Sequence, residues 1–485
     1  MKQIYLYMQK HGYSLLFLTL IVIFLIIKIP DLLLPCFWDE AWPYSVAIYD
    51  LYDHGLSLSP GAISPELYRG HPIFYHFCQV LWMKIFGSSL LVAKTFPLFI
   101  SVMLLISVYM FCKALFDKKI GIVAVLFILL QPVFLTQSTF LLPEIFLALL
   151  TLLTFYSYVD KKKILYLLAC SAMLLTKETG AVFFISIFVW HFIDFIRNKE
   201  RNFVAFLKSS LFLAIPILPV AAFFVTQKII YGWFLFPFHV ELLDKSNLLD
   251  KIFNRFDFVF ISKANWFLFA LTILSLALYL YRKIKFKKEN LISKQFGFFI
   301  LFLIFATFFV IFCAVNFFSP RYILCILPLV MIAYAYWIIT LFNFKPVLSL
   351  IPVTIISVMF ISININAQNK RSLDHSLSFR NAVDCQKQTV QYLEENNYYD
   401  ASIFTHFLMR VDLEYKCAGY RSNDVPFTNI LNEFDGNAQY CIFSDVEYSN
   451  EFDEIKSSYD LELVKRFERN HAYTEIYRVK TSAAK

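Results

Sequence analysis

The feature that most constrains this chain is a series of long apolar runs. A helix needs about 20 apolar residues to cross a bilayer, with about 17 as the usual lower limit. The mean hydropathy of +0.61 and the 59% of hydrophobic residues exceed what an ordinary globular domain carries. The sequence therefore predicts an α-helical polytopic membrane protein of about eleven spans, at residues 14–30, 89–112, 120–136, 144–159, 164–177, 180–196, 209–227, 265–281, 296–315, 322–341 and 346–363.

Charged residues divide the chain into two domains. Residues 1–363 hold 30 Lys and Arg against 17 Asp and Glu, whereas residues 364–485 hold 14 against 19. The basic part coincides with the apolar runs, so we expect a membrane domain over residues 1–363 and a soluble domain over residues 364–485. We attribute the positive charge to orientation in the membrane and expect no nucleic-acid partner.

The soluble part carries the periodicities of a small α/β domain. Residues 376–396 predict an amphipathic helix with Val383, Val390 and Leu393 on one side. Short apolar segments predict strands, and a second helix lies between two of them. The strands are residues 401–405, 440–445, 461–467 and 473–479, and the helix is residues 447–458.

Basic residues also mark one side of the membrane. If the N-terminus is cytoplasmic and the spans alternate, the inner segments hold 19 of the 30 Lys and Arg. They hold only five acidic residues when Asp194, beside Arg197, is counted with them, which is a positive-inside pattern. An odd number of spans then places the C-terminal domain outside the cytoplasm. No small-residue cleavage site follows the first run, so it is a retained helix. A composition rich in Phe, Ile, Lys and Asn indicates an AT-rich genome and thus a bacterial inner membrane.

The nine cysteines argue against a zinc module and leave one disulfide open. No CxxC pair or other close metal-ligand spacing occurs. Cys385, Cys417 and Cys441 lie in the soluble domain, where an oxidising compartment allows one disulfide. The sequence does not choose the pair.

Two outer segments are long. The first, residues 31–88, contains a helical spacing that suits a helix in the membrane interface, formed by Ile73, Phe74, Phe77, Leu81 and Ile85. The second, residues 228–263, mixes charge with Trp233, Phe236 and Phe238. This second segment is either an interfacial aromatic belt or a mobile loop over a lipid-linked substrate.

Two adjacent carboxylates stand near the start of the first outer segment. Asp39 and Glu40 lie between Trp38 and Trp42, shortly after the first span. The plain interpretation is solvated loop charge. An acid in a partly apolar wall can instead act as a base, or stay ionised and hold a hydroxyl or a divalent metal. Asp39 is the candidate metal ligand, and carboxylates alone leave a metal cofactor open.

A turn in the same segment offers two cations. Arg69 and His71 flank a glycine in the sequence Tyr-Arg-Gly-His-Pro, which is a turn by composition. Either the arginine meets lipid headgroups or the two side chains contact a substrate phosphate.

Three further candidates for substrate binding fall on the same predicted face. Glu144 begins the fourth span, where an acid is also an ordinary helix cap. Lys177 precedes Glu178 between two spans, where the pair is also read as an exposed ion pair. Arg321 follows Phe-Phe-Ser-Pro, and its plain interpretation is a side chain that snorkels to the interface.

Taken in order, these motifs resemble the GT-C glycosyltransferases. The chain has an Asp-Glu pair in the first outer segment, a Gly-His-Pro turn before the second span, an acid at the head of the fourth span, and Pro-Arg-Tyr followed by Leu-Pro before a late span. The set is most similar to the protein mannosyltransferase and aminoarabinose transferase group, a glycosyltransferase family 39-like group. The resemblance covers about residues 10–360.

The resemblance implies a polyprenyl-phosphate sugar donor, with its lipid among the spans and its phosphate at the outer face. Asp39 is then the catalytic carboxylate that abstracts or orients the acceptor proton, and Glu40 supports it. His71 takes the place of a phosphate-binding lysine of aminoarabinose transferases, and Arg321 is a further phosphate contact. Trp42 departs from the arginine usual there, and the Gly-His-Pro-Ile turn lacks a second proline, which leaves the phosphate ligands open.

The expected function is transfer of a sugar, with inversion, to a lipid, glycan or protein acceptor outside the cytoplasm. Such a reaction needs a base near the attacking hydroxyl and cations at the leaving phosphate. Two alternatives remain. A glycolipid transporter or flippase would carry inverted repeats and charge at the midplane of interrupted spans. A non-enzymatic membrane protein with an outer interaction domain would not need Asp39.

Overall fold

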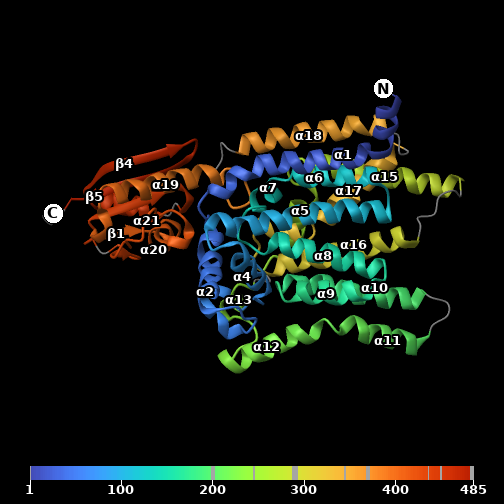
Figure 1. Cartoon of the computed structure of the whole chain (residues 1–485), viewed down its shortest axis with the longest axis horizontal. Coiled ribbons are helices and arrows are strands. Elements are labelled where there is room, and N and C mark those ends of the chain that lie inside the picture. Colours follow the sequence, from blue (N-terminus) through green and yellow to red (C-terminus); the bar gives the residue numbers. More distant parts are fainter. Residues whose placement is uncertain are drawn as a thin grey trace.

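A bundle of long helices forms most of the protein, and a small sheet domain lies at one end of it (Figure 1). The computed structural model describes residues 2–197, 202–243, 246–286, 293–342, 346–367, 372–434, 436–447 and 450–480. The termini lie at opposite ends of the molecule, because the first helix starts at the end far from the sheet domain.

Every predicted apolar run contains a helix or a broken pair of helices. The helices are α1 (Lys2–Lys28), α5 (Leu90–Leu115), α6 (Lys118–Leu129), α7 (Pro132–Gln137), α8 (Glu144–Val159), α9 (Lys163–Leu174), α10 (Thr179–Arg197), α11 (Phe203–Ala214), α12 (Ile217–Tyr231), α15 (Asn265–Phe286), α16 (Ser293–Val315), α17 (Leu327–Leu341) and α18 (Pro346–Ala367). The α-helical membrane fold is therefore confirmed. Helix α18 continues beyond residue 363, the predicted end of the membrane domain.

The number of spans stays a prediction. Within the described residues, six helices are long and apolar enough to cross a membrane, or seven if the bent pair α11 and α12 counts as one span. That pair bends by 49° at Pro216, which has no N–H to donate and whose ring crowds the preceding turn. Helices α8, α9 and α17 are apolar but shorter.

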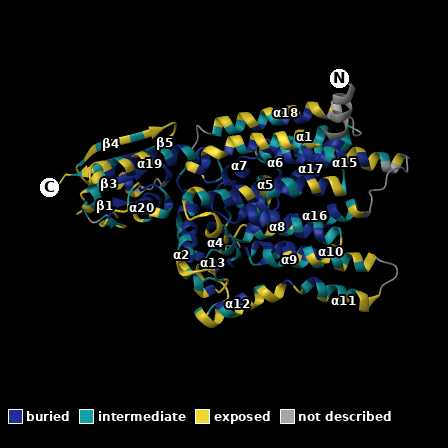
Figure 2. Cartoon of the chain, in the orientation of Figure 1, coloured by how far each residue is buried: buried dark blue, intermediate teal, exposed yellow. Residues whose placement is uncertain are grey.

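The interior of the bundle is packed from α5, α6, α8 and α17. Helix α5 packs against α6 and α8, and α17 packs against α6 and α15. Residues of this centre are buried, whereas α1, α11, α12 and α18 expose one side (Figure 2). The exposed side is apolar, with Leu218 and Ile229 on α12 and Ile351 and Val358 on α18, as expected of helices that face lipid.

The first outer segment forms short helices at the end of the bundle next to the sheet domain. They are α2 (Val46–His54), α3 (Pro65–Tyr68) and α4 (Phe74–Phe86). Helix α4 is the one predicted from spacing. It buries Tyr75 and Gln79 and exposes Leu81 and Ile85, so an apolar face points outward as an interfacial helix requires. The second outer segment contains α13 (Pro237–Glu241) and α14 (Leu248–Phe256).

The C-terminal domain is the small α/β unit that the sequence predicts. Its five-stranded sheet has the order β2-β1-β3-β5-β4. Strand β1 is parallel to β2 and β3, whereas β5 is antiparallel to β3 and β4. The strands are β1 (Ile403–Thr405), β2 (Ile430–Leu431), β3 (Tyr440–Ser444), β4 (Leu461–Arg469) and β5 (Ala472–Val479), with helices α19 (Phe379–Glu395), α20 (Phe407–Glu414) and α21 (Asn450–Ser458).

The predicted elements of this domain are present, with small shifts at their ends. Val383, Val390 and Leu393 are fully buried on α19, which packs against β4 and β5. Strand β2 is absent from the prediction because it has only two residues. Part of the predicted helix at 447–458, residues 448 and 449, lies outside the described residues. All nine cysteines are free, so the structure contains no disulfide between Cys385, Cys417 and Cys441.

The sheet domain rests directly on the loop that follows α1. The Cys36 amide donates to the Ala418 carbonyl at 2.8 Å, and the Tyr420 hydroxyl donates to the Cys36 carbonyl at 2.9 Å. Gly419 has a φ of +90° and lies against Pro35, where a side chain would also meet Leu90. These contacts fix the backbone immediately before the Asp-Glu pair.

Candidate active site

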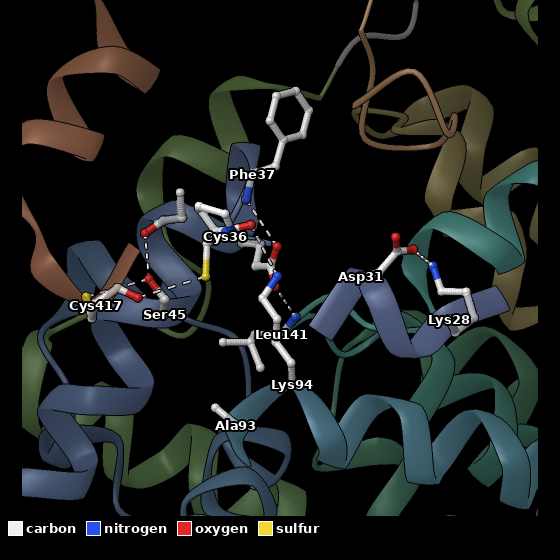
Figure 3. Close-up of polar contacts among 12 residues, drawn as sticks. Lys28, Asp31, Cys36, Phe37, Ser45, Ala93, Lys94, Leu141 and Cys417 are labelled. Carbon is white, nitrogen blue, oxygen red and sulfur yellow. Dashed lines mark hydrogen bonds and ion pairs between the residues drawn. The ribbon is translucent and has the colours of Figure 1, made fainter. Parts of the chain in front are cut away.

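Glu40 is the anchor of the Asp-Glu pair. Its Oε2 accepts the Phe37 amide at 3.1 Å, and its Oε1 accepts the Leu141 amide at 3.1 Å and lies 3.0 Å from Lys94 Nζ. Figure 3 shows Lys94 and Leu141 reaching this point from separate segments. Both charged side chains are fully buried. Both Glu40 oxygens therefore bind groups of the protein itself, and these bonds hold the loop in place.

Asp39 points to a different neighbour. It lies in the short 3₁₀ turn Trp38–Glu40, after Trp38 in a left-handed conformation with a φ of 57°. Such a conformation costs a bulky residue about 1–3 kcal/mol and is common at functional sites. One Asp39 oxygen accepts a hydrogen bond from the Arg321 guanidinium, and the side chain is 18% exposed. The two adjacent acids thus have separate roles.

Arg321 is the centre of the site. It lies in the 3₁₀ helix Pro320–Cys325 ahead of α17 and is only 4% exposed. Its Nε donates to Glu144 Oε1 at 3.3 Å, and its two terminal nitrogens donate to Asp39 and Asp374. A guanidinium is suited to this position because its planar fork presents several donors at once.

Lys177 completes this group. Its Nζ lies 3.0 Å from Glu144 Oε1 and 4.1 Å from the centre of the Tyr322 ring. Within the described residues, Glu144 Oε2 is buried without a hydrogen-bond partner. The space beside it is too narrow to hold a water molecule and is lined by Glu144, Leu147, Lys177, Thr179, Tyr322 and Cys325. A buried unpaired carboxylate oxygen is costly, and a ligand donor group reaches this oxygen only if the lining side chains move.

The Gly-His-Pro turn forms a second, adjacent group. His71 Nδ1 lies 2.7 Å from Glu178 Oε2, and the His71 and His239 rings are 4.8 Å apart. The Arg69 guanidinium lies 5.2 Å from the centre of the Trp42 ring. Gly70 has a φ of +72°, and a Cβ there would lie 2.9 Å from the Phe236 side chain. The first and second outer segments therefore meet at this turn.

The pKa values outside the spans follow from these ion pairs. Burial favours a raised pKa for Asp374, but the Arg321 guanidinium outweighs it and lowers that pKa. Burial likewise opposes ionisation of Glu178, and His71 outweighs it and lowers the Glu178 pKa. Burial together with the nearby His71 lowers the pKa of His239 to about 4.

Several of the plain interpretations are wrong. Lys177 and Glu178 do not form an exposed pair, because Lys177 is buried against Glu144 and Glu178 binds His71. Arg321 does not snorkel, because it is buried among three carboxylates. The sequence-predicted residues Asp39, Glu144, Lys177 and Arg321 meet in one cluster. Arg69 and His71 lie beside it, and Glu40 supports it.

Two members of the site were not predicted. Asp374 carries no motif, and its only signal is an Asp-His pair shortly after the last apolar run. Lys94 lies near the start of an apolar run, and nothing in its local sequence indicates a partner 54 residues earlier. Both contacts arise from tertiary structure, which local spacing does not encode.

A metal site at Asp39 stays a prediction. Among the residues that the structure describes, no group of three or more His, Cys, Asp and Glu side chains is placed to hold a metal ion. Asp39 faces a guanidinium, which already fulfils the electrostatic role of a cation at that carboxylate.

Comparisons with known proteins concern the fold of the chain. The family model described as dolichyl-phosphate-mannose-protein mannosyltransferase matches residues 70–223, a stretch that includes His71, Glu144 and Lys177. The crystal structure of ArnT from Cupriavidus metallidurans bound to undecaprenyl phosphate superposes with a TM-score of 0.61 over 96% of this chain and 98% of that chain, at 12% identity. The chain has the GT-C glycosyltransferase fold. The resemblance inferred from the motifs is thereby confirmed.

Other solved structures extend the comparison. ArnT from Cupriavidus metallidurans in the apo state gives a TM-score of 0.60 with the same coverage and 12% identity. The oligosaccharyltransferase of Archaeoglobus fulgidus tethered with an acceptor peptide gives 0.51, at 12% identity, over 87% of this chain and 64% of that chain. No curated protein sequence matches this chain significantly.

Proposed function

We propose that the chain is a membrane glycosyltransferase that moves a sugar from a polyprenyl phosphate to an acceptor outside the cytoplasm. The observation that carries the proposal is the cluster in which Asp39, Glu144, Lys177 and Arg321 meet. These residues come from four segments that are distant in sequence. Two buried cations beside carboxylates are the groups that transfer from a sugar phosphate requires.

The reaction follows from their chemistry. The acceptor hydroxyl oxygen attacks the anomeric carbon while the bond from that carbon to the phosphate oxygen breaks. The electron pair of that bond leaves with the polyprenyl phosphate, whose charge Arg321 and Lys177 stabilise. Asp39 takes the proton of the hydroxyl. A single displacement inverts the anomeric configuration and needs one base, unlike hydrolysis by two separated carboxylates.

The remaining residues have supporting roles in this proposal. Glu40 is a positioning residue, because its bonds to Lys94 and to two backbone amides fix the loop that presents Asp39. Glu144 orients Lys177 and Arg321 and offers its free Oε2 to a hydroxyl or amino group of the sugar.

The identity of the substrates rests on similarity. A structure with the same fold binds undecaprenyl phosphate, which supports a polyprenyl-phosphate donor here. A structure of similar fold is tethered to an acceptor peptide, which supports a separate acceptor molecule here. The acceptor in this proposal is a lipid, a glycan or a protein. We further propose that the protein lies in a bacterial inner membrane with its N-terminus in the cytoplasm.

The test compares products in cells that lack the gene and carry a plasmid-borne copy. Wild type, Asp39→Asn and Asp53→Asn are expressed at equal levels, and envelope glycans and lipids are compared by mass spectrometry. Asp53 is an exposed acid in the same outer segment, so it matches the charge change away from the site. We expect the glycosylated product with wild type and Asp53→Asn, and its loss with Asp39→Asn. Full product from folded Asp39→Asn, or movement of a glycolipid without sugar transfer, contradicts the proposal.

A further inference from the structure

Asp374 links the C-terminal domain to the active site. Of the three carboxylates on Arg321, it alone comes from the segment between α18 and α19. Its side chain is 10% exposed, and its second oxygen lies 3.3 Å from His375 Nδ1. None of the motifs and none of the comparisons assigns this residue a role.

The charges of the site indicate what Asp374 does. Asp39, Glu144 and Asp374 oppose Arg321 and Lys177, so with His375 neutral the cluster has a net charge of −1. A sugar phosphodiester adds one negative charge, and the cluster would then carry −2 in a buried site. An uncompensated buried charge is strongly unfavourable. Binding is therefore favoured if one carboxylate leaves Arg321 as the phosphate arrives.

The geometry shows which carboxylate is able to leave. Glu144 is shared with Lys177 and is itself buried in the first turn of α8. Asp39 has to remain to receive the acceptor proton. The Asp374 backbone is held separately, because its carbonyl accepts Gln137 Nε2 at 2.6 Å. Its side chain can therefore turn away from Arg321, toward His375, while its backbone stays in place.

The domain also stays docked when this side chain moves. Arg380, in the first turn of α19, lies 2.8 Å from Asp31, which also pairs with Lys28 at the end of α1. The Phe379 ring packs 6.0 Å from Phe37 and 4.9 Å from Phe140. These contacts are independent of Asp374.

We propose that Asp374 is a positioning residue that stands in for the donor phosphate. It holds the Arg321 guanidinium in its binding orientation and yields its place when the lipid phosphate enters. This inference rests on the proposed function, in which Arg321 binds that phosphate. It assigns the C-terminal domain a direct role, because the domain supplies the group that competes with the donor.

The test measures binding of undecaprenyl phosphate to the full-length protein in nanodiscs. Wild type is compared with Asp374→Asn, Asp374→Glu, Arg321→Ala and the control Asp384→Asn. Asp384 lies on α19, 3.1 Å from Arg469, and is 37% exposed, so its replacement gives the same charge change far from Arg321. A neutral amide competes less for a guanidinium than a carboxylate does, so we expect Asp374→Asn to bind the lipid phosphate roughly tenfold more tightly. Asp374→Glu and Asp384→Asn should bind as wild type does.

The outcomes separate this inference from the function on which it rests. Unchanged or weaker binding by folded Asp374→Asn, with wild-type binding intact, overturns the role of Asp374 alone. Wild-type binding that does not depend on Arg321, or no binding by any variant, overturns the proposed function as well. If Asp374→Asn does not fold, Asp374→Ser removes the same charge with a smaller side chain. A loss of affinity in Asp374→Ser then marks a structural residue and contradicts the proposal.

Discussion

Replacing Lys94 with methionine should destabilise the protein strongly, because it leaves the Glu40 carboxylate buried without its cation. Both side chains are fully buried, and Lys94 Nζ lies 3.0 Å from Glu40 Oε1. Removing one partner of a buried ion pair costs about 3–5 kcal/mol. The two backbone amides that donate to Glu40 remain, so we expect the lower half of that range.

A double-mutant cycle isolates the pair from the packing of the new side chains. Lys94→Met, Glu40→Gln and the double variant are unfolded in mixed micelles, and the free energy of unfolding is measured for each. The double variant has no unpaired buried charge, so its loss should be smaller than the sum of the two single losses by about 2–3 kcal/mol.

The same substitution at a surface ion pair is the matched control. Lys162 pairs with Asp160 at 3.5 Å and is 48% exposed, so Lys162→Met should cost less than about 1 kcal/mol. Lys94→Met should also slow sugar transfer in the protein that folds, because the Asp39 loop loses its anchor. A coupling energy below about 0.5 kcal/mol between Lys94 and Glu40 would refute the reasoning.

Three further predictions follow from the site and its supports. Arg321→Lys keeps the charge but loses the planar fork, so transfer should fall by about 100-fold or more in a steady-state assay, with expression unchanged. Burial lowers the pKa of His76 to about 3, below its unfolded value, so the unfolded chain binds a proton first as the pH falls. The free energy of unfolding should therefore fall by about 2 kcal/mol from pH 7 to pH 5. His76→Phe keeps the stack on Tyr44 and should remove that pH dependence in unfolding experiments. Gly419→Ala requires a left-handed alanine against Leu90, so it should loosen the sheet domain and increase its cleavage by protease.

Each of these has an outcome that contradicts it. Equal transfer by Arg321→Lys shows that a point charge suffices and that the three-way contact of the guanidinium is unimportant. An unchanged pH dependence in His76→Phe assigns the effect to other groups. Protease resistance in Gly419→Ala shows that the domain does not depend on its close approach to the loop after α1.

The fold was predictable because membrane spans are encoded locally. Apolar runs and charge at their ends are properties of single segments, so each of the eleven runs coincides with helix. The points at which a helix breaks within an apolar run were harder to predict, because a proline ends a helix only where the packing does not accommodate it. Pro97 lies inside α5, whereas Pro216 separates α11 from α12. The sheet domain was predictable for the same local reasons, except for the two-residue strand β2.

The sequence predicted which residues form the candidate site, but not which of them form ion pairs with one another. The motifs identified Asp39, Glu144, Lys177 and Arg321, and the structure brings them together. The plain interpretations treated Lys177 as a partner of its sequence neighbour, because a single sequence shows only local pairs. Its partner Glu144 is 33 residues away. Asp374 reaches the site only through the docking of the C-terminal domain.

The most direct test of the proposed function separates binding from transfer at Asp39. Purified wild type and Asp39→Asn are given undecaprenyl phosphate to measure binding, and a polyprenyl-phosphate sugar with acceptor-containing membranes to measure transfer. If Asp39 is the catalytic base, Asp39→Asn binds the lipid phosphate at least as tightly as wild type, while transfer falls by about 100-fold or more. Transfer at the wild-type rate by Asp39→Asn contradicts the catalytic assignment.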